Sequence, residues 1–189
     1  MHQTYLIRTS RQRFSLHLTA VLALAVIFSA CDTLGPGDET VELTTQVTID
    51  FRPTQEQLQS GAAIAGTSSV NLSSVLQNQY GYNISDVVAA RVSNIRFDRV
   101  QPVGVNLDAI FSSLNVSISG GNMTAVVGRT SSPPSRDSAV LTMTNNDISN
   151  AIRNPPASVF LNPDPAGNLS ESNYIFRAVI DFAVTVEGI

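Results

Sequence analysis

Residues 41–51 have the sequence VELTTQVTIDF, and their strict alternation sets the expected fold class. One side of this segment carries Val41, Leu43, Thr45, Val47, Ile49 and Phe51. The other side carries Glu42, Thr44, Gln46, Thr48 and Asp50. Successive side chains of a β-strand point to opposite faces, and Val, Ile and Thr favour strands. The segment is therefore predicted to be a strand with one face in a core and one face in water.

The C-terminal segment, residues 174–187, repeats this pattern. Its apolar side carries Tyr174, Phe176, Ala178, Ile180, Phe182, Val184 and Val186. Long amphipathic strands of this kind are typical of antiparallel sheets with one wet face. The alternation does not decide whether the first and last strands pair with each other.

Weaker strand patterns lie between these two segments. In residues 87–100 the apolar residues change from even-numbered to odd-numbered positions near Ser93 and Asn94. This change of alternation indicates a β-bulge rather than a helix. Residues 114–118 and 123–127 flank Gly120-Gly121-Asn122 and predict a hairpin. Further strands are expected at 139–144 and 158–161, and short helical turns at 72–79, 108–113 and 147–152. Asn145 or Asn146 is the expected cap of the last turn.

Together these elements predict an all-β fold. Several short strands, frequent turn residues and the lack of a long amphipathic helix favour an antiparallel β-sandwich, Ig-like or similar, with a few short helical turns. An open barrel is the alternative. Residues 41–189 are expected to form this domain as a single unit.

The N-terminal residues have the features of a secretory signal. Arg8, Arg11 and Arg13 precede an apolar run over residues 14–28, and Ser29-Ala30-Cys31 follows it. The run is shorter than the roughly 20 residues that a membrane-spanning helix needs. The small pair before the chain's single cysteine resembles the bacterial lipobox. An ordinary cleaved secretory signal and an uncleaved anchor are the alternatives.

The resemblance to bacterial lipoproteins implies a signal peptide over residues 1–30 and a lipidated Cys31. Residues 31–40 would then form a flexible tether to the domain. Asp32 resembles the inner-membrane retention signal of enterobacterial lipoproteins, but the outer membrane is the favoured location and the inner membrane the alternative. Triplets beginning at Asp32 and Asp137 resemble the O-glycosylation pattern of Bacteroidota envelope proteins, which would modify Thr33 and Ser138.

The composition after Cys31 argues against several function classes. Eight arginines and all fifteen acidic residues follow the cysteine, so this part of the chain has a net charge of −7. Binding to nucleic acid, which depends on phosphate neutralisation, is therefore not expected. This part of the chain contains no histidine, lysine or tryptophan, and its only thiol is that of Cys31. Enzymes that use a histidine base or a lysine nucleophile are excluded, and no metal or cofactor is expected. A two-carboxylate hydrolase of the glycosidase type is the alternative that stays open, but the acids are scattered singly along the chain, so a non-enzyme is expected.

Three sets of residues remain as candidate ligand contacts. Arg91, Arg96 and Arg99 surround Asp98, and arginine forks bind carboxylates and phosphates. A solvated strand face with an Arg96–Asp98 ion pair is the favoured interpretation. The loop of Tyr80, Gly81 and Tyr82 offers aromatic faces, although packing within a turn is the simpler role.

Two oxygen-rich stretches, residues 145–147 and 162–164 followed by Gly167 and Asn168, are the candidates for a calcium site. Turns and caps are favoured for both stretches, because Asn and Asp side chains hydrogen-bond the neighbouring backbone.

The sequence therefore predicts a non-catalytic, membrane-anchored envelope lipoprotein that acts as a structural or protein-interaction module. Its domain would lie in the periplasm or at the cell surface, held to the membrane through Cys31, with an envelope protein or glycan as partner. Binding of a small glycan or lipid ligand is the alternative function.

Overall fold

The structure is a computed structural model, and it describes residues 39–102, 105–130, 138–167, 169 and 173–188. The chain divides into two compact units, residues 1–33 and 34–189, and the described residues belong to the second. Cys31, Thr33 and the predicted signal and tether up to residue 38 lie outside the described residues. Within the described ranges, no helix combines the length and apolarity needed to cross a bilayer.

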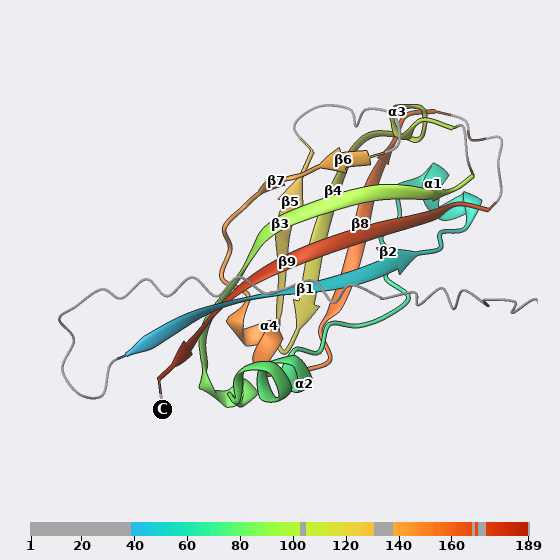
Figure 1. Cartoon of the computed structure of the whole chain (residues 1–189). Helices are drawn as coiled ribbons and strands as arrows, with labels where there is room; N and C mark the ends of the chain where they lie inside the picture. The colour runs from blue at the N-terminus through green and yellow to red at the C-terminus, as the bar shows by residue number, and fades with distance from the viewer. Residues whose placement is uncertain (1–38, 103–104, 131–137, 168, 170–172, 189) are drawn as a thin grey trace, which may run out of the picture. The chain divides into compact units, whose positions relative to one another are not determined.

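The first sheet contains the three longest of the described strands and one short strand (Figure 1). It contains β1 (Thr40–Phe51), β9 (Ile175–Glu187), β3 (Val87–Gln101) and β6 (Ser138–Val140), in the order β1-β9-β3-β6. All neighbours are antiparallel, and β1 pairs with β9 without a register shift from Thr40↔Glu187 to Phe51↔Phe176. The two alternating segments are therefore strands, and they are direct neighbours in space.

The second sheet contains β2 (Ile64–Ala65), β8 (Ser158–Pro165), β4 (Phe111–Gly120), β5 (Met123–Arg129) and β7 (Thr142–Met143), in the order β2-β8-β4-β5-β7. Its neighbours are also antiparallel. The predicted hairpin is confirmed as β4 and β5. Gly120 ends β4 and pairs with Met123, so the turn consists of Gly121 and Asn122, and Gly121 has a φ of 58° that favours glycine. The chain forms a two-sheet antiparallel sandwich, as predicted.

The expected bulge in the third strand is confirmed. The register of β3 against β9 shifts between Val92 and Asn94, next to Ser93. The shift allows Val92 and Ile95, three residues apart, both to enter the core, with 2% and 0% of their surface exposed. A bulge adds one residue to a strand and changes which face later side chains occupy.

The helical segments are short. They are α1 (Gln55–Ser60), α2 (Ser73–Val75), a π-helix η1 (Leu76–Tyr80), a 3₁₀-helix η2 (Ile84–Asp86), α3 (Leu107–Ile110) and α4 (Ser149–Arg153). The predicted turn at 72–79 is confirmed by α2 and η1. The prediction for 108–113 is wrong in its second half, because Phe111 pairs with Pro165 and begins β4.

Two other local predictions need correction. The N-cap of α4 is Ile148 rather than Asn145 or Asn146, and Asp147 accepts a hydrogen bond from the Ser149 N–H at 2.9 Å. The helix α1 was not predicted, although Thr54 and Gln57 form a capping box whose sequence pattern is visible.

The space between the sheets is filled by buried side chains. Phe51, Phe97 and Phe176 from the first sheet and Phe111 from the second are fully buried. Ring centroids of neighbouring pairs lie 5.0–6.4 Å apart. Such a core holds the two sheets together by apolar burial and close aromatic packing.

The segment predicted as one strand at 139–144 passes from one sheet to the other. β6 pairs with β3 in the first sheet, and β7 pairs with β5 in the second. Leu141 lies between them with 3% of its surface exposed, and its N–H donates to the Ile95 carbonyl. Gly128 makes room for this crossing, because a Cβ there would lie 2.9 Å from Ile95 Cδ1 and 3.2 Å from Leu141 Cβ.

Candidate functional site

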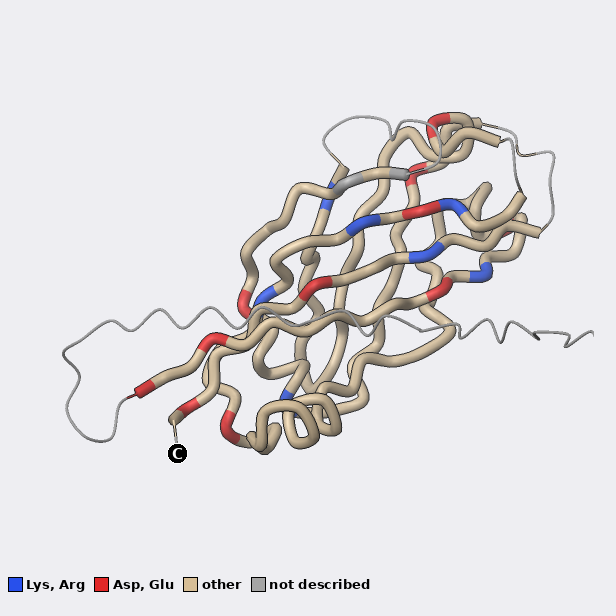
Figure 2. The backbone as a smooth tube through the Cα atoms, in the orientation of Figure 1, with Lys and Arg blue, Asp and Glu red and all other residues tan. Residues whose placement is uncertain are grey.

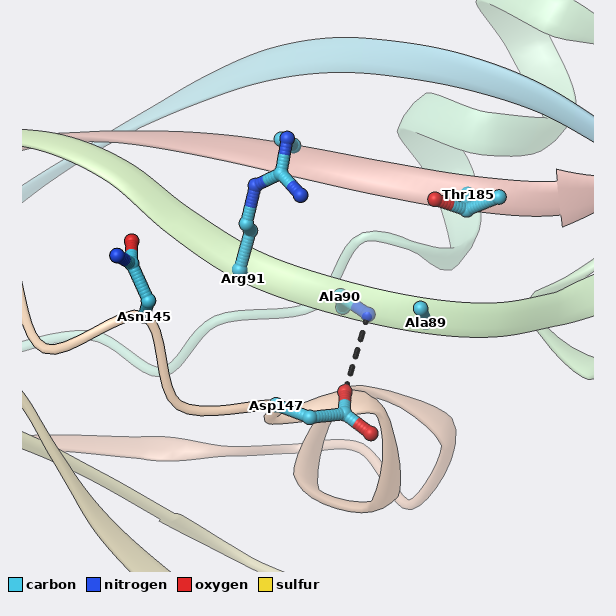
Figure 3. Close-up of a pocket in the computed structure, with 7 residues that line it drawn as sticks. Ala89, Ala90, Arg91, Asn145, Asp147 and Thr185 are labelled. Carbon is cyan, nitrogen blue, oxygen red and sulfur yellow. Dashed lines mark hydrogen bonds between the residues drawn. The ribbon is translucent and has the colours of Figure 1, made fainter.

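A shallow hollow of about 150 Å³ lies beside β3 at Ala89–Arg91, away from the residues 96–98 that pair with β6. Figure 3 shows side chains that line it. Its lining comes from β3, β9 and the segment before α4: Ala89, Ala90, Arg91, Asn145, Asp147, Ala183 and Thr185. Three of these residues are alanines, and the other four have larger polar side chains. The hollow therefore has a small apolar floor and a polar rim.

Asp147 joins the segment before α4 to strand β3 through hydrogen bonds. Its Oδ1 accepts hydrogen bonds from the Ala90 N–H at 3.2 Å and the Ser149 N–H at 2.9 Å, and its Oδ2 accepts one from Ser149 Oγ at 3.1 Å. Burial alone would raise the pKa of Asp147, but these hydrogen bonds outweigh it and lower the pKa. These hydrogen bonds hold the segment before α4 against the edge of β3.

Arg91 forms the opposite rim. Its Nη2 lies 3.0 Å from Glu42 Oε1, and about half of each side chain is exposed. Figure 3 shows Arg91 on β3 and Asn145 on the connection before α4 pointing the same way, while Asp147 turns toward Ala90. The guanidinium, amide and carboxylate of this rim can form hydrogen bonds with a small polar molecule.

Two further ion pairs lie on the outer face. Arg96 Nε lies 3.0 Å from Asp98 Oδ2, which confirms the predicted ion pair on one strand face. Arg177 binds Asp50 through two hydrogen bonds of 2.7 and 3.1 Å, and the pKa of Asp50 is lowered mainly by this contact. These guanidiniums already bind carboxylates, so they are not available to bind an anion. The outer face is therefore a solvated strand face with paired charges rather than an anion site.

Arg99 also contacts the backbone after its own strand. Its Nη1 donates to the Pro102 carbonyl, so this member of the predicted arginine cluster bonds the chain segment that follows β3. Asp181 occupies the middle of the same outer face and accepts hydrogen bonds from Gln46 Nε2 at 2.7 Å and Asn94 Nδ2 at 3.0 Å. The outer face therefore joins β1, β9 and β3 through side-chain contacts.

The tyrosine loop has a structural role. Tyr80 Oη donates to the Thr44 carbonyl on β1 at 2.8 Å, and burial raises the pKa of the Tyr80 phenol. Tyr80 and Tyr82 both pack against the core. The loop thus covers part of the outer edge of β1, as the packing interpretation predicted.

The described residues of the two oxygen-rich stretches bind different parts of the fold, and Asn168 lies outside the described residues. Asn146 Nδ2 donates to the Val126 carbonyl, and Asp147 binds backbone groups as described above. Asn162 and Asp164 lie within β8 rather than in a loop, and Asn162 Nδ2 donates to Ser117 Oγ at 3.0 Å. Among the described residues there is no group of three His, Cys, Asp or Glu side chains that could hold a metal ion.

The hollow itself was not predicted. The alternation of β3 and β9 was visible in the sequence, but the contact between Asp147 and Ala90 joins residues 57 positions apart. The Asp147-Ile148-Ser149 sequence signals a local cap, and it does not reveal which strand the carboxylate meets.

Comparisons with known proteins assign no family. No protein-family model matches the chain, and no curated protein sequence matches it. Among solved structures, the chain is similar to one from the cryo-EM structure of a semi-empty VLP of Macrobrachium rosenbergii nodavirus, with 9% identity, a TM-score of 0.34, and coverage of 93% of this chain and 99% of that chain.

Two further solved structures are similar to the chain. The mud crab tombus-like virus structure matches at 8% identity and a TM-score of 0.33, covering 100% of this chain and 96% of that chain. The crystal structure of FLHE matches at 10% identity and a TM-score of 0.21, covering 80% of this chain and 99% of that chain. With TM-scores below 0.5, these likenesses carry no functional argument.

Proposed function

We propose that the protein is a bacterial envelope lipoprotein, anchored through Cys31, whose sandwich domain is a non-catalytic interaction module. The support for the anchor is the order of arginines, apolar run and small residues before Cys31. Two or three acyl chains on one cysteine hold a protein in a bilayer far more firmly than one chain does. The outer membrane is the favoured location, with the domain in the periplasm or at the cell surface.

The packed interior is the observation that favours a surface-binding module. Five phenylalanine side chains between the sheets have no exposed surface: Phe51, Phe97, Phe111, Phe176 and Phe182. The hollow beside Asp147 has a volume of about 150 Å³, whereas pockets for drug-sized ligands measure about 300–1,000 Å³. A partner would therefore bind the outside of the sandwich, and the lipid-carrying form of the small-ligand alternative is disfavoured.

The outer face of the first sheet is the surface that we assign to a protein partner. It carries both signs of charge in alternating positions, including Glu42, Arg91, Asp181 and Arg96. Complementary charge patterns give protein interfaces their specificity and fast association. The hollow between Ala89 and Ala183 would receive a small side chain of the partner.

The anchor would determine how this face is presented. The chain enters the domain at Glu39, and Thr40 pairs with Glu187 at the same end of the sheet as Val87. The nine residues after Cys31 span at most about 30 Å when extended. Glu39, Asp86 and Glu187 make this end acidic, so anionic headgroups would repel it and the outer faces would stay accessible.

The anchor is tested by replacing Cys31. Wild-type chain expressed in a Gram-negative host should fractionate with membranes and carry an acyl mass on residue 31. The Cys31→Ser variant should stay as unprocessed precursor or appear in the soluble fraction, while the neighbouring Thr33→Ala variant should behave as wild type. Native protein that begins before residue 31 and lacks acyl mass would contradict the proposal.

The interaction surface is tested by site-specific photo-crosslinking in cells. A photoreactive residue at position 89, in the hollow, should give a defined adduct with one envelope protein. The same residue at position 158, on the outer face of the second sheet, should not give that adduct. Adducts of the same protein from both positions, or none from position 89 under conditions where a control lipoprotein crosslinks, would count against the assigned face.

A further inference from the structure

The two outer faces of the sandwich differ sharply in charge. The strands of the first sheet carry nine charged residues: Glu42, Asp50, Arg91, Arg96, Asp98, Arg99, Arg177, Asp181 and Glu187. The strands of the second sheet carry two, Arg129 and Asp164, and both stand near strand ends. Figure 2 shows the coloured charges gathered on the first sheet and the strands of the second almost without colour. The outer face of the second sheet is thus nearly neutral, in a chain with a net acidic charge.

An aromatic side chain stands in the middle of this neutral face. The structure describes six phenylalanines, and Phe160 on β8 is the one that is not among the buried core residues. Phe160 is half-buried, and its cross-strand neighbours are Ala65 on β2 and Ser117 on β4. Both neighbours are small, so the phenyl ring is not screened by a larger side chain on either adjacent strand.

Amides and hydroxyls surround the ring. Asn115 and Asn162 are directly opposite each other on β4 and β8, and Ser119 is opposite Thr124 on β5. Asn162 Nδ2 donates to Ser117 Oγ, and Thr124 Oγ1 donates to Ser119 Oγ at 2.8 Å. Among the described residues, the Asn115 side chain and the Asn162 amide oxygen have no hydrogen-bond partner. The face therefore offers free donors and acceptors without a charge.

This composition matches a glycan better than a protein. Binding hot spots between proteins are enriched in Trp, Tyr and Arg, and serine and threonine are under-represented in them. A homodimer interface is more apolar than this face, which is mainly hydroxyl and amide. A sugar ring, by contrast, presents C–H groups that pack on an aromatic ring and hydroxyls that both donate and accept hydrogen bonds.

We propose that the outer face formed by β8, β4 and β5 binds a neutral polysaccharide. Phe160 packs against one sugar ring, and Asn115 and Asn162 hydrogen-bond the hydroxyls of the same or the next residue. An anionic glycan is disfavoured because the centre of the face has no cation to meet it. This inference goes beyond the interaction module proposed above and depends neither on the anchor nor on the hollow.

The test is affinity electrophoresis of the full chain in detergent. Native gels contain a neutral polysaccharide, namely β-1,3-glucan, dextran, starch or galactomannan, or the anionic alginate as a comparison. The wild-type chain should be retarded by at least one neutral polymer and not by alginate. Phe160→Ala should weaken that binding about tenfold or more, because truncation of a central aromatic anchor removes much of the binding energy. Asn115→Ala should weaken it by a smaller factor.

Val179→Ala is the matched control, since Val179 is a half-buried apolar residue on the outer face of the first sheet. It should bind as wild type, and circular dichroism should show that all variants keep the strand spectrum. Cys31→Ser should also bind as wild type, which separates this inference from the anchor.

Four results would overturn the inference. They are retardation by none of the four neutral polymers, retardation by alginate alone, equal binding by wild type and Phe160→Ala, or a dimer in solution that Phe160→Ala dissociates. The last result would assign the face to a second copy of the chain.

Discussion

Removing the ring of Phe97 tests whether the two sheets are held together by the aromatic cluster. The Phe97 side chain has no exposed surface. Its ring centroid lies 6.4 Å from that of Phe51, 6.2 Å from that of Phe111 and 5.6 Å from that of Phe176. Phe111 belongs to the second sheet and the others to the first, so Phe97→Ala removes contacts within and between the sheets.

The expected loss of stability follows from these contacts. Truncation of a fully buried phenylalanine to alanine costs about 3–5 kcal/mol, because transfer energy is lost and a cavity remains. Each aromatic pair adds about 0.5–1.5 kcal/mol beyond its buried area, which places Phe97→Ala in the upper part of that range, at about 4–5 kcal/mol. For a domain of this size the midpoint of thermal unfolding should fall by about 10–15 °C.

Phe160→Ala provides the matched control, because the same side chain is removed from an outer face. Phe160 is half-buried and is not among the residues that pack against the core, so its truncation should cost much less than that of Phe97. Urea unfolding of the full chain, followed by far-ultraviolet circular dichroism, measures both free energies of unfolding. Equal losses for the two variants, or a loss below about 2 kcal/mol for Phe97→Ala, would refute the assignment of Phe97 to the inter-sheet core.

Three further predictions concern stability. Asp147→Ala should lower the free energy of unfolding by about 1–2 kcal/mol in urea titrations, because it removes a helix-end acceptor and leaves a buried strand amide unpaired. The Arg177 contact lowers the folded-state pKa of Asp50, so its stabilisation is present above the ordinary value of 3.8 and is lost as pH falls through the lowered pKa. Asp50→Asn should therefore lower the urea midpoint at pH 7 more than at pH 2, and an equal drop at both would contradict this. Gly66→Ala should cost about 1–3 kcal/mol, since its Cβ would lie 2.5 Å from a core isoleucine methyl carbon, whereas Gly167→Ala should leave the urea midpoint nearly unchanged.

The long strands and their buried faces were predictable from the sequence alone. The alternation of residues 41–51 and 174–186 matches the observed burial, in which Ile49, Phe51, Phe176 and Ile180 have no exposed surface. The bulge near Ser93 was also predictable, because the shift in the alternation of apolar residues is visible within one segment. These features depend on neighbouring residues of one segment, and so each segment carries its own signal.

Local signals failed where two structures competed for the same residues. Residues 108–113 suggested a helical turn, yet Phe111 is fully buried and pairs with Pro165 on β8. The segment at 139–144 suggested one strand, yet it divides at Leu141 between the two sheets. In both cases burial of an apolar side chain against a distant strand outweighed the local preference.

The candidate binding surfaces were decided by tertiary structure. The hollow combines β3, β9 and Asp147, and the neutral face combines Phe160 with Asn115 from another strand. Alternation predicts which side chains of a strand point away from the core, but it does not predict which strands become neighbours. That choice depends on how apolar faces far apart in the chain pack against each other, and this packing energy belongs to the whole fold rather than to any one segment.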